Sequence, residues 1–216
     1  MILEGIMSET VYFVLEIVGT VAFAISGAII GIRRRMDLLG IVILGSITAV
    51  GGGIIRDLIL GYTPPSAFKD PVYILTAAVT SAVVFIPPIR NFIHKSAGSR
   101  ILNDLLLIMD SVGLGVFTVI GIRAGYEVSG SSSIFLLSFV GVITGVGGGV
   151  LRDVLAREPA YIFYKHFYAC ASIIGALLCV FLWNTAGESW AMLSGTVCII
   201  LLRLAAARFR WKLPRA

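Results

Sequence analysis

The stretch Thr48-Ala-Val-Gly-Gly-Gly-Ile-Ile-Arg-Asp57 returns 96 residues later as Thr144-Gly-Val-Gly-Gly-Gly-Val-Leu-Arg-Asp153. Both copies lie inside long apolar runs, and a match of this length is too long for chance. At an offset of 94 residues further positions correspond: Glu16 with Asp110, Gly19 with Gly113, Phe23 with Phe117 and Gly27 with Gly121. We therefore interpret the chain as a duplicated unit.

The composition indicates an integral membrane protein. Hydrophobic residues make up 58% of the 216 residues, charged residues only 13%, and the mean hydropathy is +0.98, whereas soluble domains carry about 25% charged residues. The net charge of +5 does not indicate nucleic-acid binding, because the basic residues lie between apolar runs. The three cysteines lie within apolar runs and no catalytic, metal or cofactor motif is present, so we expect no enzyme, metal or cofactor.

Seven apolar runs are long enough to cross a bilayer, since a spanning helix needs about 20 residues. They cover residues 10–32, 38–60, 71–89, 104–123, 133–156, 167–183 and 190–207. The sequence thus predicts an all-α, polytopic membrane protein with seven transmembrane helices. Because each repeat unit has three spans, the two units must cross in opposite directions. We expect an inverted 3+3 repeat, 10–89 and 104–183, followed by a seventh helix at 190–208.

The distribution of Lys and Arg predicts the orientation, because short cytoplasmic loops carry the positive excess. If the N-terminus is outside, thirteen basic residues fall on the cytoplasmic side and only two, Lys69 and Arg123, on the outer side. The thirteen are Arg33, Arg34, Arg35, Arg90, Lys95, Arg100, Arg157, Lys165, Arg203, Arg208, Arg210, Lys212 and Arg215. The prediction is a multi-pass inner-membrane protein with its N-terminus outside and its C-terminus in the cytoplasm.

The two glycine triplets have two interpretations. They are Gly51, Gly52 and Gly53 in the second span and Gly147, Gly148 and Gly149 in the fifth. Each glycine weakens a helix by about 1 kcal/mol relative to alanine, and irregular backbone within a membrane is tolerated only beside protein or a wet cavity. The triplets are therefore candidates for kinks that line a cavity. Alternatively, they permit close helix packing, as small residues at four-residue spacing do; both interpretations can hold together.

Charged pairs follow each triplet, Arg56 with Asp57 and Arg152 with Asp153. A charge at the bilayer centre costs about 2.5–3.5 kcal/mol on the insertion scale, so such groups usually face a polar interior and pair. Adjacent helical residues point about 100° apart, so we expect each arginine to pair across helices. The candidate partners are Glu16 in the first span and Asp110 in the fourth. The alternative is that the arginines extend to the lipid headgroups.

With these features, the sequence resembles the prokaryotic branch of the trimeric intracellular cation channels over about residues 10–208. The resemblance rests on the tandem three-span repeats, each carrying Gly-Gly-Gly-x-x-Arg-Asp, and on the seventh helix. It implies a homotrimer, with membrane lipids around it, in which each subunit has its own pore for monovalent cations such as K⁺, with Na⁺ as a second candidate. The first, second, fourth and fifth helices would form that pore, and the second and fifth would kink at the triplets.

The pore-associated positions that the resemblance implies are Gly51, Gly52, Gly53, Arg56 and Asp57, and Gly147, Gly148, Gly149, Arg152 and Asp153; Glu16 and Asp110 join them as the intramembrane acids. Some bacterial relatives with the same repeat are described as glycine carriers, so a secondary transporter of a small zwitterion such as glycine is the alternative. A non-transporting membrane scaffold is the third hypothesis, which the intramembrane charges disfavour.

Overall fold

The computed structural model describes residues 2–129, 133–160, 162 and 167–211, and every regular element within these ranges is an α-helix. The helices are α1 (Ile2–Arg33), α2 (Leu38–Leu60), α3 (Ser66–Lys69), α4 (Val72–Val84), α5 (Pro87–Lys95), α6 (Arg100–Ser129), α7 (Ile134–Leu155), α9 (Tyr168–Ala186) and α10 (Glu188–Arg208). In the described part of the chain, six helices are long and apolar enough to span a membrane, and the bent pair α4–α5 brings the number to seven. The predicted all-α, seven-span fold class is confirmed.

The third span is shorter than the sequence suggested. The apolar run predicted a helix over 71–89, but α4 ends at Val84 and α5 begins at Pro87, bent by 68° from α4. The reason is the pair Pro87 and Pro88, which occupies the first turn of α5, where proline is favoured, and excludes helical backbone at the residue before it. At 1.5 Å per residue, α4 is about 20 Å long, so it does not cross a bilayer core by itself.

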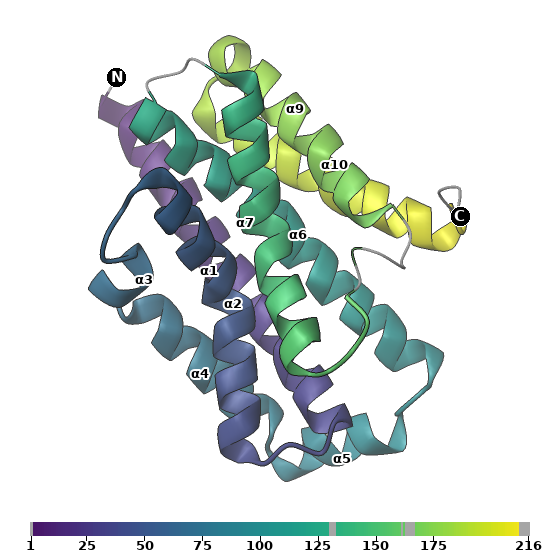
Figure 1. Ribbon diagram of the computed structural model, residues 1–216. Coiled ribbons are helices and arrows are strands. Elements are labelled where there is room, and N and C mark those ends of the chain that lie inside the picture. Colours follow the sequence, from purple (N-terminus) through teal and green to yellow (C-terminus); the bar gives the residue numbers. More distant parts are fainter. Residues whose placement is uncertain (1, 130–132, 161, 163–166, 212–216) are drawn as a thin grey trace.

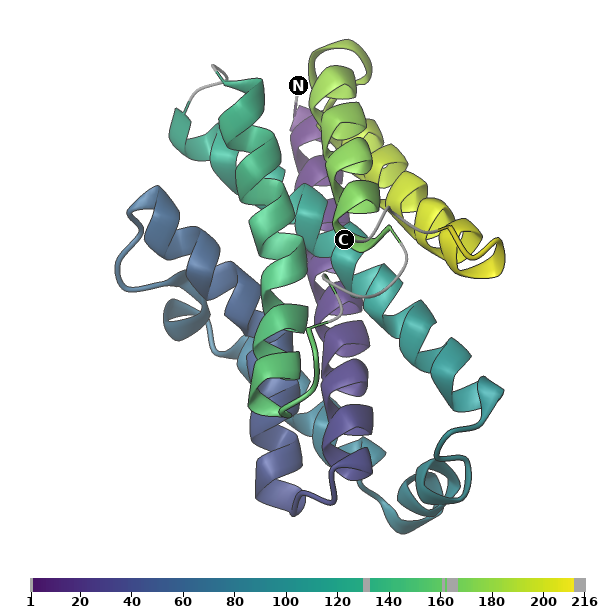
Figure 2. The ribbon, with the colours of Figure 1, turned by 45° about the vertical axis from the view of Figure 1, so that its right-hand side comes forward.

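The helices pack in two corresponding groups. Helix α1 packs against α2 and α4, and α6 packs in the same manner against α7 and α9. Helices α1 and α6 contact each other, α2 and α7 join the two groups, and α10 covers α9 and α6 (Figure 1). In the turned view, α10 (yellow) lies at the edge of the bundle, away from α2 and α4 (Figure 2).

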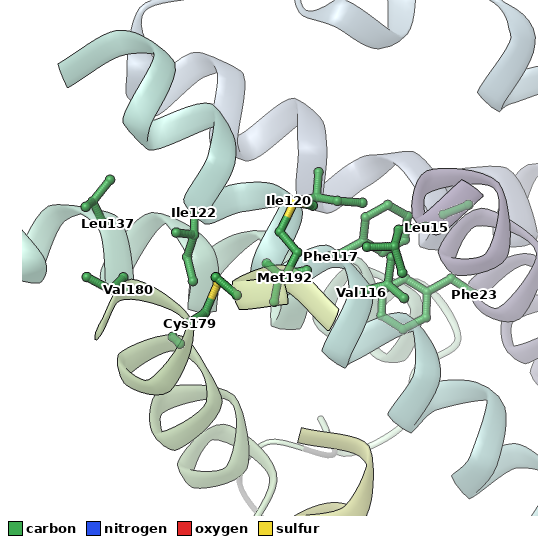
Figure 3. Close-up of a cluster of buried hydrophobic side chains, with 14 of the residues drawn as sticks. Leu15, Phe23, Val116, Phe117, Ile120, Ile122, Leu137, Cys179, Val180 and Met192 are labelled. Atoms are coloured by element: carbon green, nitrogen blue, oxygen red, sulfur yellow. The ribbon is translucent and has the colours of Figure 1, made fainter. Parts of the chain in front are cut away.

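The centre of the bundle is apolar. Phe23 on α1 and Phe117 on α6, which correspond in the repeat, have ring centroids 5.3 Å apart and lie within a buried cluster that includes Leu15, Val116 and Met192 (Figure 3). Glycines make room for these rings: a Cβ atom on Gly113 would lie 2.1 Å from Cδ1 of Phe23. The small residues of α1 and α6 thus let the two long helices approach closely.

Helices α2 and α7 meet at the glycine triplets. A Cβ atom on Gly52 would lie 2.1 Å from the carbonyl oxygen of Thr144, and one on Gly148 would lie 2.1 Å from the carbonyl oxygen of Thr48. Both helices remain α-helical through their triplets, so the triplets do not interrupt the helices. Close packing, the second of the two interpretations, is what the middle glycine of each triplet provides.

Candidate functional site

A cavity of about 210 Å³ lies between α1, α2, α3 and α4, and its lining on α1 comes from Tyr12, Glu16 and Thr20. Its charged lining residues are Glu16, Arg56 and Asp70. The hydroxyl groups of Tyr12, Thr20, Ser66 and Tyr73 contribute further polar lining, and Gly53 and Phe117 lie at its apolar side. Because two of the three charged residues are acidic, the cavity carries a net negative charge when all three are ionised.

Arg56 is held at the wall of this cavity by its own neighbour. Its Nε donates to Oδ1 of Asp57 at 2.8 Å, and its Nη2 lies 3.2 Å from Oγ of Ser66. Oδ2 of Asp57 accepts from the backbone N–H and the hydroxyl of Ser66, at 2.7 and 2.6 Å. The segment that begins α3 therefore folds over Asp57 and closes a compact, neutral group.

The predicted pairing of Arg56 with Glu16 is wrong. Although adjacent Cα–Cβ vectors diverge on a helix, the arginine side chain is long enough to turn back to Asp57, and α3 supplies the remaining partner. The headgroup alternative is also wrong for this residue, because Arg56 is only 6% exposed.

Glu16 instead has neutral partners. The hydroxyl of Tyr12, one helical turn earlier, donates to its Oε1 at 2.9 Å, and the hydroxyl of Tyr73 on α4 forms a second hydrogen bond with its carboxyl group. Since neither tyrosine carries a positive charge, these contacts orient the carboxyl group in the cavity without forming an ion pair. Tyr12, Tyr73 and Ser66 were not predicted from the sequence, because no motif indicated that α3 and α4 would lie against α1 and α2.

In the second half of the molecule, Arg152 forms the predicted contact with Asp110. Its Nη1 donates to Oδ1 of Asp110 on α6 at 2.7 Å and also to the hydroxyl of Ser26 on α1. Its Nε donates to Oδ1 of Asp153 at 2.9 Å. The arginine is 1% exposed, which contradicts the headgroup alternative here as well. One side chain thus links α1, α6 and α7.

A second buried arginine joins this group. Nη2 of Arg203 on α10 lies 3.7 Å from Oδ2 of Asp110, and its guanidinium carbon lies 4.5 Å from the ring centroid of Tyr168 on α9. Arg203 was predicted to be one of the cytoplasmic topology residues, but its side chain is fully buried. The sequence did carry a signal for this burial, because Arg203 lies inside the apolar run 190–207 and not in the loop that follows it.

The two halves therefore use the same motif differently. In the second half two arginines, Arg152 and Arg203, lie with two aspartates, Asp110 and Asp153, so the buried charges balance. In the first half Arg56 and Asp57 balance, and the carboxyl group of Glu16 remains in the cavity as an additional acid. In its ionised form, a carboxyl group beside a small cavity attracts cations.

The outer members of the triplets lie at different distances from these groups. A Cβ atom on Gly53 would have Nη2 of Arg56, 3.9 Å away, as its nearest neighbour, whereas one on Gly149 would lie 2.9 Å from the hydroxyl of Tyr168. Of the other two, Gly147 faces Gly52 and Gly51 faces Leu151. The first triplet thus borders the cavity and the second borders the buried charge group.

The structure also shows the state of the cysteines and of three threonine hydroxyls within the spans. All three cysteines are free thiols, and within the described residues no group of three or more His, Cys, Asp or Glu side chains could hold a metal ion. The hydroxyls of Thr48, Thr118 and Thr144 donate to carbonyl oxygens of their own helices. Of the residues that predicted the orientation, Lys165, Lys212 and Arg215 lie outside the described ranges.

Comparison with known proteins identifies relatives over nearly the whole chain. The profile of the family described as "Glycine transporter" matches residues 13–87 and 107–184. The inner membrane protein YadS of Escherichia coli K12, described as UPF0126, is 40% identical over 202 residues, which are 93% of each chain. A UPF0126 membrane protein of Vibrio cholerae is 36% identical and covers 98% of this chain and 85% of its own.

Solved structures give the same picture at the level of the fold. The trimeric intracellular cation channel orthologue from Rhodobacter sphaeroides is 33% identical, with a TM-score of 0.83 over 94% of this chain and all of its own. A second structure, solved to explain conductance through these cation channels, is 37% identical, with a TM-score of 0.79 over 94% of this chain and 96% of its own. A prokaryotic channel of this kind in 0.5 M KCl is 29% identical, with a TM-score of 0.84 over 95% of this chain and all of its own. These neighbours are membrane channels, not enzymes.

Proposed function

The chain belongs to the UPF0126 membrane proteins and to the family of the prokaryotic trimeric intracellular cation channels, and we propose that it conducts monovalent cations, K⁺ above all and Na⁺ as well. The single observation that carries the proposal is the cavity beside Glu16. Its carboxyl group has hydroxyl partners, and the nearby Arg56 is neutralised by Asp57. A hydrated cation that enters this space gains a favourable interaction with fixed negative charge, whereas an anion is repelled.

We further propose the route of the ion. It begins in the cavity, passes Gly53 and the contact of Phe23 with Phe117, and continues past Gly149 to the group around Arg152. Helices α1, α2, α6 and α7 line this route, and the glycine triplets are where α2 and α7 bend as it opens. In the present conformation the apolar rings and the buried charge group, with Arg152 bonded to Asp110 and Ser26, close its second half.

The assembly and orientation follow the same proposal. Three copies form a homotrimer with one pore in each subunit; the solved relative from Rhodobacter sphaeroides is described as a trimeric channel. Each subunit consists of the repeats 10–89 and 104–183 and the added helix 190–208. The cavity then faces the outside of an inner membrane, the arginine-rich ends face the cytoplasm, and membrane lipids surround the trimer.

Currents through the purified protein in planar bilayers test the channel. Under a KCl gradient, we expect unitary currents whose reversal potential lies near the K⁺ equilibrium potential, and replacement of K⁺ by a large organic cation should abolish them. Currents that reverse at the Cl⁻ equilibrium potential would contradict cation selectivity.

One observation favours a second candidate, a carrier for a small zwitterion such as glycine. Arg56 and Glu16 line the same cavity, so a guanidinium group and a carboxyl group are both present for a carboxylate and an amine. This candidate predicts saturable counterflow of labelled glycine in proteoliposomes without unitary currents. Unitary K⁺ currents without counterflow would exclude it.

A further inference from the structure

A second cavity, of about 400 Å³, lies at the opposite end of the bundle, where α1 ends, α2 begins and α4 turns into α5. Its rim carries Arg35, Arg90, Asn91 and His94, and its apolar wall includes Ile32 and Ile41. None of the residues that line it is acidic. A space with cationic and amide donors on one side and buried aliphatic groups on the other suits an amphipathic anion.

The nearby charged groups do not neutralise this rim. The carboxylate of Asp37 accepts from the backbone N–H of Gly40 at 2.7 Å and thereby caps α2. Glu158 pairs with Arg34, not with Arg35, at 3.1 Å. Arg90 lies over the ring of Phe85, with its guanidinium carbon 4.8 Å from the centroid, and this neutral ring does not cancel its charge.

The backbone at Arg35 adopts a conformation that suits glycine. Helix α1 ends with the N–H of Met36 bonded to the carbonyl of Gly31 and that of Arg35 to Ile32, an arrangement in which glycine is the usual left-handed residue. Arg35 has φ 58° there. The corresponding position at the end of α2 is Gly61, with φ 80°. Because glycine is favoured in this conformation, Arg35 can be replaced by glycine without strain at the helix end.

The position of the cavity indicates where its ligand comes from. Helix α5 turns by 68° from α4, and it carries Arg90, His94 and Lys95 on the same short helix as the buried Ile93. Such basic amphipathic helices lie in the interface between lipid headgroups and acyl chains. With α5 in this interface, the cavity beside it would lie at the depth of lipid phosphates.

We propose that this cavity binds a phosphate group, with Arg35 and Arg90 as its principal donors. Guanidinium groups recognise phosphate oxygens through paired N–H donors, and Asn91 and His94 can donate to the remaining oxygens. The chemistry is shared by the phosphodiester of a phospholipid and by free phosphate. For a phospholipid, the apolar wall at Ile32 and Ile41 accommodates the first part of an acyl chain. The site is distinct from the ion route and does not depend on it.

Arg35→Gly is the decisive variant, because glycine suits the left-handed backbone and the helix end should fold at least as well. Arg157→Gly is its matched control: Arg157 ends α7 in the same way, with φ 52° and the N–H of Glu158 bonded to the carbonyl of Asp153, but it does not line the cavity. The probes are phosphatidylglycerol, a diacylglycerol with the same acyl chains, and inorganic phosphate, each added to the detergent-purified protein. Binding is measured by native mass spectrometry for the lipids and by the shift of the thermal unfolding midpoint for phosphate.

We expect the wild type and Arg157→Gly to bind phosphatidylglycerol equally, and Arg35→Gly to bind it about tenfold more weakly, the loss expected for one charged hydrogen bond. Arg90→Gln should weaken binding in the same way. Binding of phosphatidylglycerol alone identifies a lipid site, and binding of inorganic phosphate as well identifies a site for free phosphate; both support the proposal. Equal affinity of Arg35→Gly and Arg157→Gly, or equal binding of the diacylglycerol, would overturn it.

Discussion

Two acids at corresponding positions of the repeat, Glu16 and Asp110, have different partners. Asp110 accepts a hydrogen bond from the guanidinium group of Arg152 and lies near Arg203, so its negative charge is balanced within the protein. The carboxyl group of Glu16 forms hydrogen bonds with the hydroxyls of two tyrosines and lines a cavity. Opposite charges at short distance in a dry interior hold helices together, whereas a carboxyl group with neutral donors can still attract a mobile cation.

The first prediction concerns Glu16→Gln, which keeps the shape of the side chain and removes its charge. Two unit charges 4 Å apart in water interact with about 1 kcal/mol. Loss of this attraction for K⁺ should lower the ratio of K⁺ to Cl⁻ permeability by about fivefold or more. Reversal potentials under a KCl gradient measure this ratio. Glu9→Gln is the control, because Glu9 is 69% exposed and pairs with Arg123 outside the cavity; an equal loss in both variants would contradict a specific role for Glu16.

The second prediction concerns the hydroxyl of Ser26, which accepts from Arg152 across the helix contact. Ser26→Ala removes a hydrogen bond worth about 1 kcal/mol from the closed conformation. The ratio of open to closed time in single-channel records should therefore rise about fivefold. Ser81→Ala is the matched control, since that buried hydroxyl donates to the carbonyl of Ala77 in its own helix, at 2.8 Å. An unchanged ratio in Ser26→Ala would argue against closure by this group.

At the scale of elements, the crossing of α2 and α7 determines how the two halves are joined. The middle glycines bring backbone against backbone, and the flanking Gly53 has open space toward the cavity. The same three-residue motif therefore has two functions, contact on one face of the helix and access on another. The neighbouring α4–α5 bend depends on different chemistry, because proline excludes helix before it.

The third prediction separates these two functions of the triplet. Gly52→Ala places a methyl group 2.1 Å from the carbonyl oxygen of Thr144, so the helices must separate, and overpacking costs about 1–3 kcal/mol or more. We expect a clearly lower thermal unfolding midpoint in detergent. Gly53→Ala, with no atom closer than 3.9 Å to the new group, should keep or raise the midpoint, because alanine favours a helix by about 1 kcal/mol. Equal destabilisation by both would contradict the packing assignment.

At the scale of the whole molecule, the odd number of spans in each repeat is the central constraint. Two three-span units in one chain must be inverted with respect to each other, and the helix contacts of α1 with α2 and α4 correspond to those of α6 with α7 and α9. The cavity beside Glu16 in the first half corresponds to the closed group around Asp110 in the second. The superposition of residues 10–89 on 104–183 by a rotation of about 180° around an axis in the membrane plane stays a prediction.

The fourth prediction is the orientation. With the positive residues in the cytoplasm, a green fluorescent protein fused after Ala216 should fluoresce, and alkaline phosphatase fused at the same place should be inactive. The corresponding fusions before Met1 should give the opposite result when a separate signal sequence delivers them. A fluorescent N-terminal fusion together with an active C-terminal phosphatase would show the reverse orientation.

The sequence by itself determined the fold class, the number of spans, the repeated motif and the boundaries of the second and fifth spans to within a residue, whereas α1 begins earlier than predicted and α6 extends further at both ends. These depend on local properties: apolar runs of sufficient length, a detectable duplication, and the high cost of charges in hydrocarbon. Only the tertiary structure decided the partners, because side chains such as Tyr73, Ser66 and Arg203 reach the site from helices whose relative positions no local pattern encodes. For that reason the pairing of Arg152 with Asp110 was predictable from symmetry, whereas that of Arg56 with Asp57 depended on how α3 folds over the helix end.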